Sequence, residues 1–145
     1  MDETPFGLRV RVALDYDAAV ERTTTALKEE GFGVLTSIDV KQTLKQKTDT
    51  DFRKYVILGA CNPVLAHRAL QAEIDMGLLL PCNLIVYETG PDASVVAAMA
   101  PLPMIGIVGD NPTLRDVARE ADERLRRVLR SLEAQPAPAI DRTGR

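Results

Sequence analysis

Both cysteines and the only histidine of this 145-residue sequence fall within one stretch, YVILGACNPVLAHRALQAEIDMGLLLPCNLIVY, which runs from Tyr55 to Tyr87. Cys61 stands just before a helical pattern that begins with Pro63. The positive end of a helix dipole can lower the pKa of a thiol placed there, which would make Cys61 a nucleophile at neutral pH. The alternative is a small buried side chain that closes a strand, because free cysteine is among the most often buried residue types.

Cys82 and Asn83 form the second candidate site. On the topology derived below, they lie at the end of the sheet that also carries Tyr16 and a basic segment with Lys41 and Lys45. A thiol, a carboxamide, a phenol and two ammonium groups in one pocket would suit a small anionic ligand. The alternative is a buried strand start beside lysines that only face water.

The residue spacing gives little support for a metal site, a phosphate-binding loop or a hydrolase site. His67 follows Cys61 by six residues, but a zinc site needs three or four converging ligands, and CxxC and HxxxH spacings are absent from the sequence. We therefore predict no metal site and a surface position for His67. No Walker loop, GxSxG or GxGxxG motif is present, so we predict neither phosphate-cradling nor hydrolase chemistry, and no cofactor.

The elements that position these residues begin with a strand. Residues 55–60 form a short apolar run closed by Cys61-Asn62-Pro63, which predicts a buried strand. Asn62 then caps a helix with Pro63 at its first position, and the helical spacing of apolar residues continues to about Gly77. A second buried strand is expected from Cys82 to Glu88.

This order of strand, helix and strand predicts a right-handed crossover unit with parallel strands. Cys61 would end the first strand and Cys82 would begin the next. We therefore expect the two thiols at opposite ends of the sheet, more than about 10 Å apart. A disulfide needs Cα atoms within about 7 Å, so none is predicted.

The remaining segments supply further strands and helices. Before the central stretch, the pattern predicts a strand over residues 6–14, a helix from Asp15 or Asp17 to Glu30, a strand over 33–40, and a helical turn with a loop over 41–54. After it, we expect a hairpin strand over 93–99, a covering loop over 101–109, and a helix over 112–133. The apolar seam of this last helix packs on the protein's own sheet or forms a dimer contact.

Together these elements predict an α+β fold. It is a two-layer β-α-β-β-α-β sheet of the ferredoxin-like split βαβ kind, with an extra hairpin strand and a long C-terminal helix. We expect a flexible N-terminus over residues 1–5, a single domain over 6–133, and a disordered Pro/Ala-rich tail over 134–145.

Several phrases of the sequence resemble the domain of unknown function 302 family, which is found mainly in bacteria and archaea. They are YVILGACNP with the A-x3-L helix after it, GLLLPCN before an apolar strand, the upstream TLKQK, Pro101 and the long terminal helix, so the resemblance covers about residues 6 to 133. The sequence departs from the family pattern at Ala100, where an Asp is usual, and at Asp49, where a Gly is usual. The resemblance implies a small single-domain α/β protein that often self-associates, and it implies no established activity.

Composition narrows the functional classes. A net charge of −3 and a pI near 5.2 disfavour a nucleic-acid binder, whose affinity comes mostly from Lys and Arg. No apolar run approaches the roughly 18 residues of a membrane span, and the start MDETPF lacks the features of a secretory signal. We expect a cytoplasmic protein that binds no membrane, and two cysteines suit such a reducing compartment.

These observations lead to a first hypothesis of a non-enzymatic binding or sensing module. It would act as a homodimer and hold a small, possibly anionic ligand near Cys82 and the basic segment. The alternative is a thiol-based redox protein or cysteine-dependent enzyme that uses Cys61, Cys82 or both. A third hypothesis makes the dimer surface itself the function.

Overall fold

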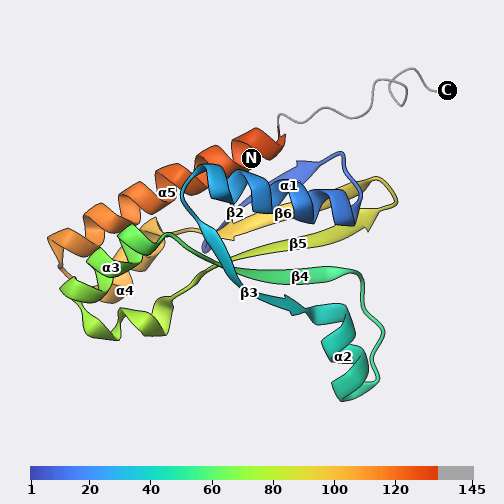
Figure 1. Ribbon diagram of the computed structural model, residues 1–145, viewed down its shortest axis with the longest axis horizontal. Helices are drawn as coiled ribbons and strands as arrows, with labels where there is room; N and C mark the ends of the chain where they lie inside the picture. The colour runs from blue at the N-terminus through green and yellow to red at the C-terminus, as the bar shows by residue number, and fades with distance from the viewer. Residues whose placement is uncertain (134–145) are drawn as a thin grey trace.

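The computed structural model describes residues 1–133, which form one antiparallel sheet and the helices around it (Figure 1). The order across the sheet is β1-β2-β6-β5-β4-β3, and the strands are β1 (Asp2–Glu3), β2 (Gly7–Val12), β3 (Gly33–Asp39), β4 (Tyr55–Cys61), β5 (Cys82–Gly90) and β6 (Ala93–Met99). The helices are α1 (Tyr16–Glu29), α2 (Val40–Thr48), α3 (Pro63–Ala72), η1 (Ile74–Leu79), η2 (Leu102–Met104), α4 (Ile105–Val108) and α5 (Pro112–Glu133). The α+β class, the extra hairpin strand β6 and the long C-terminal helix are as predicted. The tail predicted to be disordered, 134–145, lies outside the described residues.

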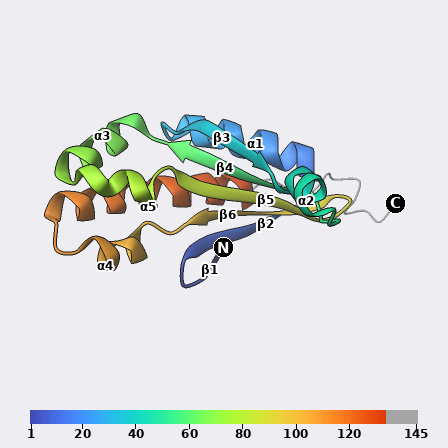
Figure 2. The same cartoon turned by 90° about the horizontal axis from the view of Figure 1, so that it is seen from below.

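One face of the sheet is buried because apolar residues alternate along its strands. Val10 of β2, Leu58 of β4 and Leu84 of β5 lie on that face and are at most 3% exposed. Helices α1 and α5 cover it, and Figure 2 shows the strands in front of these helices. The apolar seam predicted for the last helix includes Leu125 and Leu132, which lie in the core, so the seam packs on the protein's own sheet. Burying each such side chain contributes about 1.5–3 kcal/mol.

Two helix starts show the predicted capping chemistry, and a third helix is capped in the same way. Asp15 Oδ1 accepts a hydrogen bond of 2.8 Å from the Ala18 N–H, so this residue, not the second predicted candidate, caps α1. Asn62 Oδ1 accepts one of 3.2 Å from the Leu65 N–H at the start of α3. Asn111 caps α5 in the same way. Each cap contributes about 1 kcal/mol by satisfying a backbone donor that the helix leaves free.

The central pair of strands runs in the opposite sense to the one expected. β4 and β5 are antiparallel, with Tyr55 opposite Tyr87 and Ala60 opposite Cys82. The crossover rule assumes a helix that packs across a sheet face. Instead α3 ends at Ala72 and packs against α5, and η1 returns the chain at the same end of the sheet (Figure 1). The prediction of parallel strands is therefore wrong.

The N-terminus was expected to be flexible over residues 1–5, but strand pairing and hydrogen bonds hold it against the rest of the protein. Asp2 and Glu3 form β1 against β2. The Arg126 side chain of α5 donates to the Glu3 carboxylate at 2.7 Å, and the amino group of Met1 donates to Glu133 at 2.6 Å. These partners lie more than a hundred residues away along the chain, so no local pattern could indicate them.

The segment between β3 and β4 is more regular than the single helical turn expected. It contains the nine-residue helix α2, which ends at Asp49 with φ 51°. Glycine adopts this left-handed conformation without strain and is the residue most often found there at helix ends. The segment predicted as a covering loop, 101–109, holds the short helices η2 and α4. No helix within residues 1–133 is long and apolar enough to cross a membrane.

Candidate functional site

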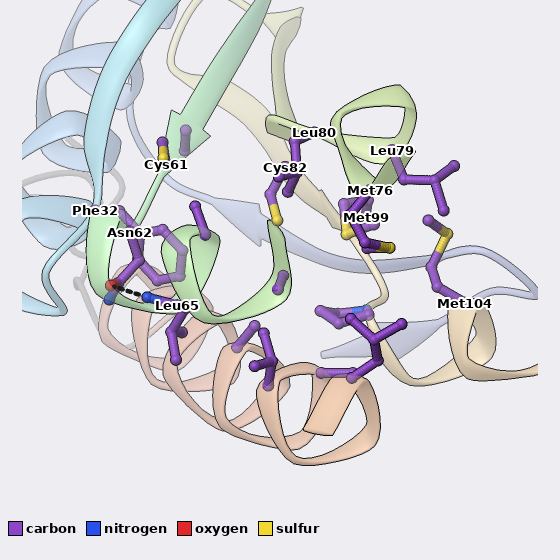
Figure 3. A pocket seen from close by; sticks show the side chains of 18 residues that line it. Phe32, Cys61, Asn62, Leu65, Met76, Leu79, Leu80, Cys82, Met99 and Met104 are labelled. Carbon is purple, nitrogen blue, oxygen red and sulfur yellow. Dashed lines mark hydrogen bonds between the residues drawn. The ribbon is translucent and has the colours of Figure 1, made fainter. Parts of the chain in front are cut away.

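A cavity of about 80 Å3 lies at the end of the sheet where β4 stops and β5 begins (Figure 3). Residues of α3, η1, η2 and α5 line it together with the ends of β4, β5 and β6. Its walls are almost entirely apolar, with Leu65 from α3, Leu80 before β5 and Leu114 from α5 among them. This end of the molecule is the first candidate for a binding site.

Both cysteines line this cavity, and both are free thiols. Cys82 lies opposite Ala60, so its side chain leaves the sheet on the helix-covered face. Cys61 is one residue further along β4, which turns its side chain to the other face. The thiols therefore lie at the same end of the sheet but on opposite faces, which corrects the predicted placement at opposite ends.

Gly59 allows the chain before Cys82 to approach β4 closely. A Cβ on Gly59 would collide with Thr36 Oγ1 and would lie 2.8 Å from Pro81 Cγ. Because Pro81 packs over the strand at this point, it sets the position from which β5 starts. The close approach thus fixes where Cys82 enters the cavity.

Three of the four methionines line the same cavity, which the sequence analysis missed. Met76 comes from η1, Met99 from the end of β6 and Met104 from η2, and Figure 3 labels all three among the side chains that line the cavity. Their spacing follows no helical or strand period. The only sequence signal is that all three fall between residues 76 and 104.

The environment of Cys82 makes it a poor nucleophile. Burial raises the pKa of this thiol to about 11, and the neighbouring Cys61 adds to the rise. The thiolate is the nucleophilic form of cysteine, so at neutral pH Cys82 carries its proton and reacts slowly.

Asn62 and His67 have the roles that the sequence predicted for a cap and a surface residue. The Asn62 carboxamide caps α3 and also donates to the Glu30 carbonyl oxygen at 3.5 Å, so its polar atoms are occupied. His67 is exposed on α3 and does not line the cavity. Within residues 1–133, no group of three or more His, Cys, Asp or Glu side chains could hold a metal ion.

The residues predicted to share a pocket with Cys82 are not brought together. Lys41 and Lys45 belong to α2, which lies at the opposite end of the sheet from α3 (Figures 1 and 2). Tyr16 begins α1 and lies near Glu88, at the far end of β5. Asn83 lines a groove on the uncovered sheet face instead. The predicted pocket required β5 to start beside the beginning of β4, and the antiparallel pairing excludes this.

Acidic side chains lie beside two of the residues that were predicted to bind an anion. The Lys45 ammonium group pairs with the carboxylates of Asp49 and Asp51 at 3.0 and 3.3 Å. Burial raises the pKa of Tyr16, and nearby carboxylates, Asp39 foremost, raise it further. An anion placed beside these side chains would meet carboxylates of its own sign.

Comparison with known proteins places the chain in a family. The sequence profile described as domain of unknown function DUF302 matches residues 8–132. The chain belongs to this family. A crystal structure of an uncharacterized conserved DUF302 protein from Bacillus stearothermophilus is 34% identical and superimposes with a TM-score of 0.79, over 88% of this chain and 98% of that one. No curated protein matches the sequence.

The raised pKa of Cys82 predicts a specific dependence of this DUF302 domain's stability on pH. Between about pH 9 and pH 11 the unfolded chain loses the thiol proton while the folded chain keeps it, so the free energy of unfolding falls as pH rises. We expect wild type to lose up to about 2 kcal/mol more than Cys82→Ala over this range.

Denaturant unfolding of the two proteins at matched pH values measures this difference. Every other titrating group is common to both proteins and cancels, and the packing cost of the substitution adds only a constant. A difference that stays the same from about pH 8 to about pH 11 would contradict the raised pKa.

Proposed function

We propose that the protein is a non-enzymatic binding module that holds a small ligand in the cavity between α3, α5 and η1. The observation that carries the proposal is the open volume of about 80 Å3 among apolar side chains. A ligand seated among these side chains would bury apolar surface of its own, which contributes about 25 cal/mol per Å2.

The absence of a catalytic set around Cys82 supports binding in preference to catalysis. No His, Asp, Glu, Lys or Arg lines the cavity among the described residues, so no general base lies beside the thiol. The high pKa of Cys82 also argues against a nucleophilic role at neutral pH. The thiol-enzyme alternative therefore depends chiefly on Cys61. Because no charged side chain lines the walls, the cavity suits an uncharged ligand.

Filling the cavity from within provides the sharpest test. Ala66 and Ala72 both belong to α3, but only Ala66 lines the cavity, so Ala66→Leu fills it and Ala72→Leu is the matched control. Native mass spectrometry would detect ligand retained from the cell. A thermal-shift panel of benzene and short-chain alcohols would measure binding to the purified protein.

At least one probe should stabilise wild type and Ala72→Leu, by about 2.7 kcal/mol when its concentration is 100 times its Kd, and should not stabilise Ala66→Leu. If no probe stabilises wild type and no mass is retained, the proposal fails. It also fails if Ala66→Leu binds as well as the control.

We further propose that the uncovered face of the sheet mediates self-association. Ile38, Ile57 and Ile85 lie in one row across β3, β4 and β5 on this face. Beside them the rings of Tyr55 and Tyr87 stack with centroids 5.5 Å apart. Antiparallel sheets commonly leave one face in water, but such a face is normally polar. A continuous apolar row is instead typical of a protein interface.

Sedimentation at micromolar concentration tests the homodimer. Wild type should sediment as a dimer, and Ile85→Lys should sediment as a monomer because it places a charge in the middle of the apolar row. Val64→Lys is the control, since Val64 is an exposed apolar residue of α3, away from this face. A monomeric wild type, or a dimer that survives Ile85→Lys, would rule out this interface.

A further inference from the structure

A groove of about 660 Å3 lies on the uncovered face of the sheet, over the neighbouring strands β2, β6 and β5 (Figure 2). The strand register explains why the face is hollow there. Ala97 of β6 lies between two larger neighbours, Arg9 of β2 and Ile85 of β5, and forms the floor between them. Among residues 1–133, this groove and the cavity beside α3 share one lining residue, Met99.

Hydrogen bonds hold the two ends of the groove in place. Phe6 lines one end, and its carbonyl oxygen accepts a hydrogen bond of 2.9 Å from the Ala100 N–H. Its side chain is 80% exposed, so the ring stands beside the groove and not in the core. Phe52 lines the other end, where its carbonyl oxygen accepts from the Lys41 ammonium group at 2.8 Å. A ligand would therefore meet walls that are already positioned, which reduces the entropic cost of binding.

Aromatic rings form one wall of the groove. The rings of Tyr55 and Tyr87 stack with centroids 5.5 Å apart, and the Phe52 ring lies 5.9 Å from that of Tyr55 at an angle of 55°. Aromatic rings pair with one another in offset-stacked or edge-to-face arrangements. The wall therefore suits a ligand with an aromatic body.

The charge of the groove is positive, although the chain as a whole has a net charge of −3. Arg9 and Arg53 line the groove, and no Asp or Glu lines it among the residues that the structure describes. Arg53 Cζ lies 5.7 Å from the centroid of the Tyr87 ring, and Arg9 Nη2 lies 3.7 Å from an Asp2 carboxylate oxygen. Exposed pairs such as Arg9 and Asp2 contribute little to stability, so the Arg9 guanidinium keeps its capacity to bind an anion. A guanidinium group offers paired donors to acidic groups.

We propose that this groove binds a small aromatic anion. The acidic group of the ligand is held by Arg9, and its rings lie over Ala97 beside Tyr87. Arg53 adds positive charge from the aromatic wall. Asn83, which was predicted to bind a ligand, lines the groove and offers an exposed carboxamide with both donors and an acceptor. The site is separate from the cavity beside α3, so the inference goes beyond the function proposed above.

The groove shares Ile85 with the apolar row proposed for self-association. From Ile85 the row extends toward β3, whereas the groove extends toward β2. Ile38 lies at the β3 end of the row and does not line the groove. Ile38→Lys therefore disturbs the dimer contact and leaves the groove intact. This variant should bind the anion at least as tightly as wild type, and weaker binding would contradict a site within one protomer.

Fluorescence titration of the full-length protein with 8-anilino-1-naphthalenesulfonate (ANS), an aromatic anion, tests the proposal. Arg9→Gln should weaken ANS binding by about tenfold or more, because it removes a charge-assisted hydrogen bond. Arg11 lies on the same face of β2 but does not line the groove, so Arg11→Gln is the matched control for net charge. At physiological ionic strength it should change the affinity by less than about threefold.

The uncharged analogue N-phenyl-1-naphthylamine isolates the contribution of the acidic group. It has the rings of ANS without the sulfonate, so Arg9→Gln should leave its affinity unchanged. Equal affinities of Arg9→Gln and Arg11→Gln for ANS would overturn the proposal. An equal effect of Arg9→Gln on both compounds would overturn it as well.

Filling the floor of the groove provides a second matched pair of variants. Ala97 and Ala93 lie on the same strand and the same face, but only Ala97 lines the groove among the described residues. Ala97→Leu should lose ANS binding, and Ala93→Leu should bind as wild type does. Circular dichroism must show that each variant is folded, because ANS also binds the apolar surface of partly folded states. If Ala97→Leu does not fold, the arginine variants decide.

Ala66→Leu distinguishes this site from the cavity beside α3, because it fills the cavity and leaves the groove unchanged. ANS should bind wild type and Ala66→Leu alike. Loss of ANS binding in Ala66→Leu would place the probe in the cavity and overturn the groove as its site, while the binding function of the cavity would stand. If ANS binds through Arg9 but neither benzene nor an alcohol stabilises wild type, the cavity function fails and the groove site stands.

Discussion

The antiparallel pairing of β4 with β5 is the constraint on which the rest of the site depends. Because Ala60 lies opposite Cys82, the chain that leaves the sheet at Cys61 must return to it at the same end. Everything between these two residues, α3 and η1, is therefore an excursion from that end. The packing of α3 against α5 forms one side of the cavity, and the start of β5 places Cys82 in its wall.

The helix layer explains why α3 takes this path. The apolar face of the sheet is already covered by α1 and by the seam of α5. A third helix that crossed this face would displace α1 or α5. No helix covers the opposite face within the described residues (Figure 2). α3 instead extends the helix layer beyond the strands, where Leu65 and Ala69 are buried. The cavity lies at the joint between this extension and the sheet.

Local structure was largely readable from the sequence, because its causes are local. Asn62 with Pro63 gave the start of α3, the seven-residue spacing of Leu125 and Leu132 gave the buried side of α5, and Ala93 to Met99 gave β6 with its bounds. Strand direction was not readable in this way. The direction of β5 relative to β4 depends on which surfaces of the protein remain free for α3. The residues between 61 and 82 alone do not indicate which surfaces these are.

The candidate site shows the same division. Cys82 and the cap at Asn62 were found from their neighbours in sequence, and both lie at the cavity. Tyr16, Lys41 and Lys45 were assigned to the same pocket only through the assumed strand direction, so they failed together with it. The methionines were missed because η1, β6 and η2 meet only in three dimensions. The resemblance to the DUF302 family was recognised, but a family without an established activity supplies no site.

The two departures from the family pattern have different structural settings. Asp49 occupies a left-handed position at the end of α2, remote from the cavity. Ala100 is buried between Met99 and Pro101, which both line the cavity, and its N–H donates to the Phe6 carbonyl oxygen.

Cross-strand nuclear Overhauser effects test the central claim most directly, because they report strand direction without reference to any ligand. The antiparallel register predicts backbone contacts of Ala60 with Cys82 and of Tyr55 with Tyr87. Parallel strands would instead place Tyr55 beside Cys82 and Cys61 beside Glu88. Observation of that second set would separate the thiols and remove the cavity described here.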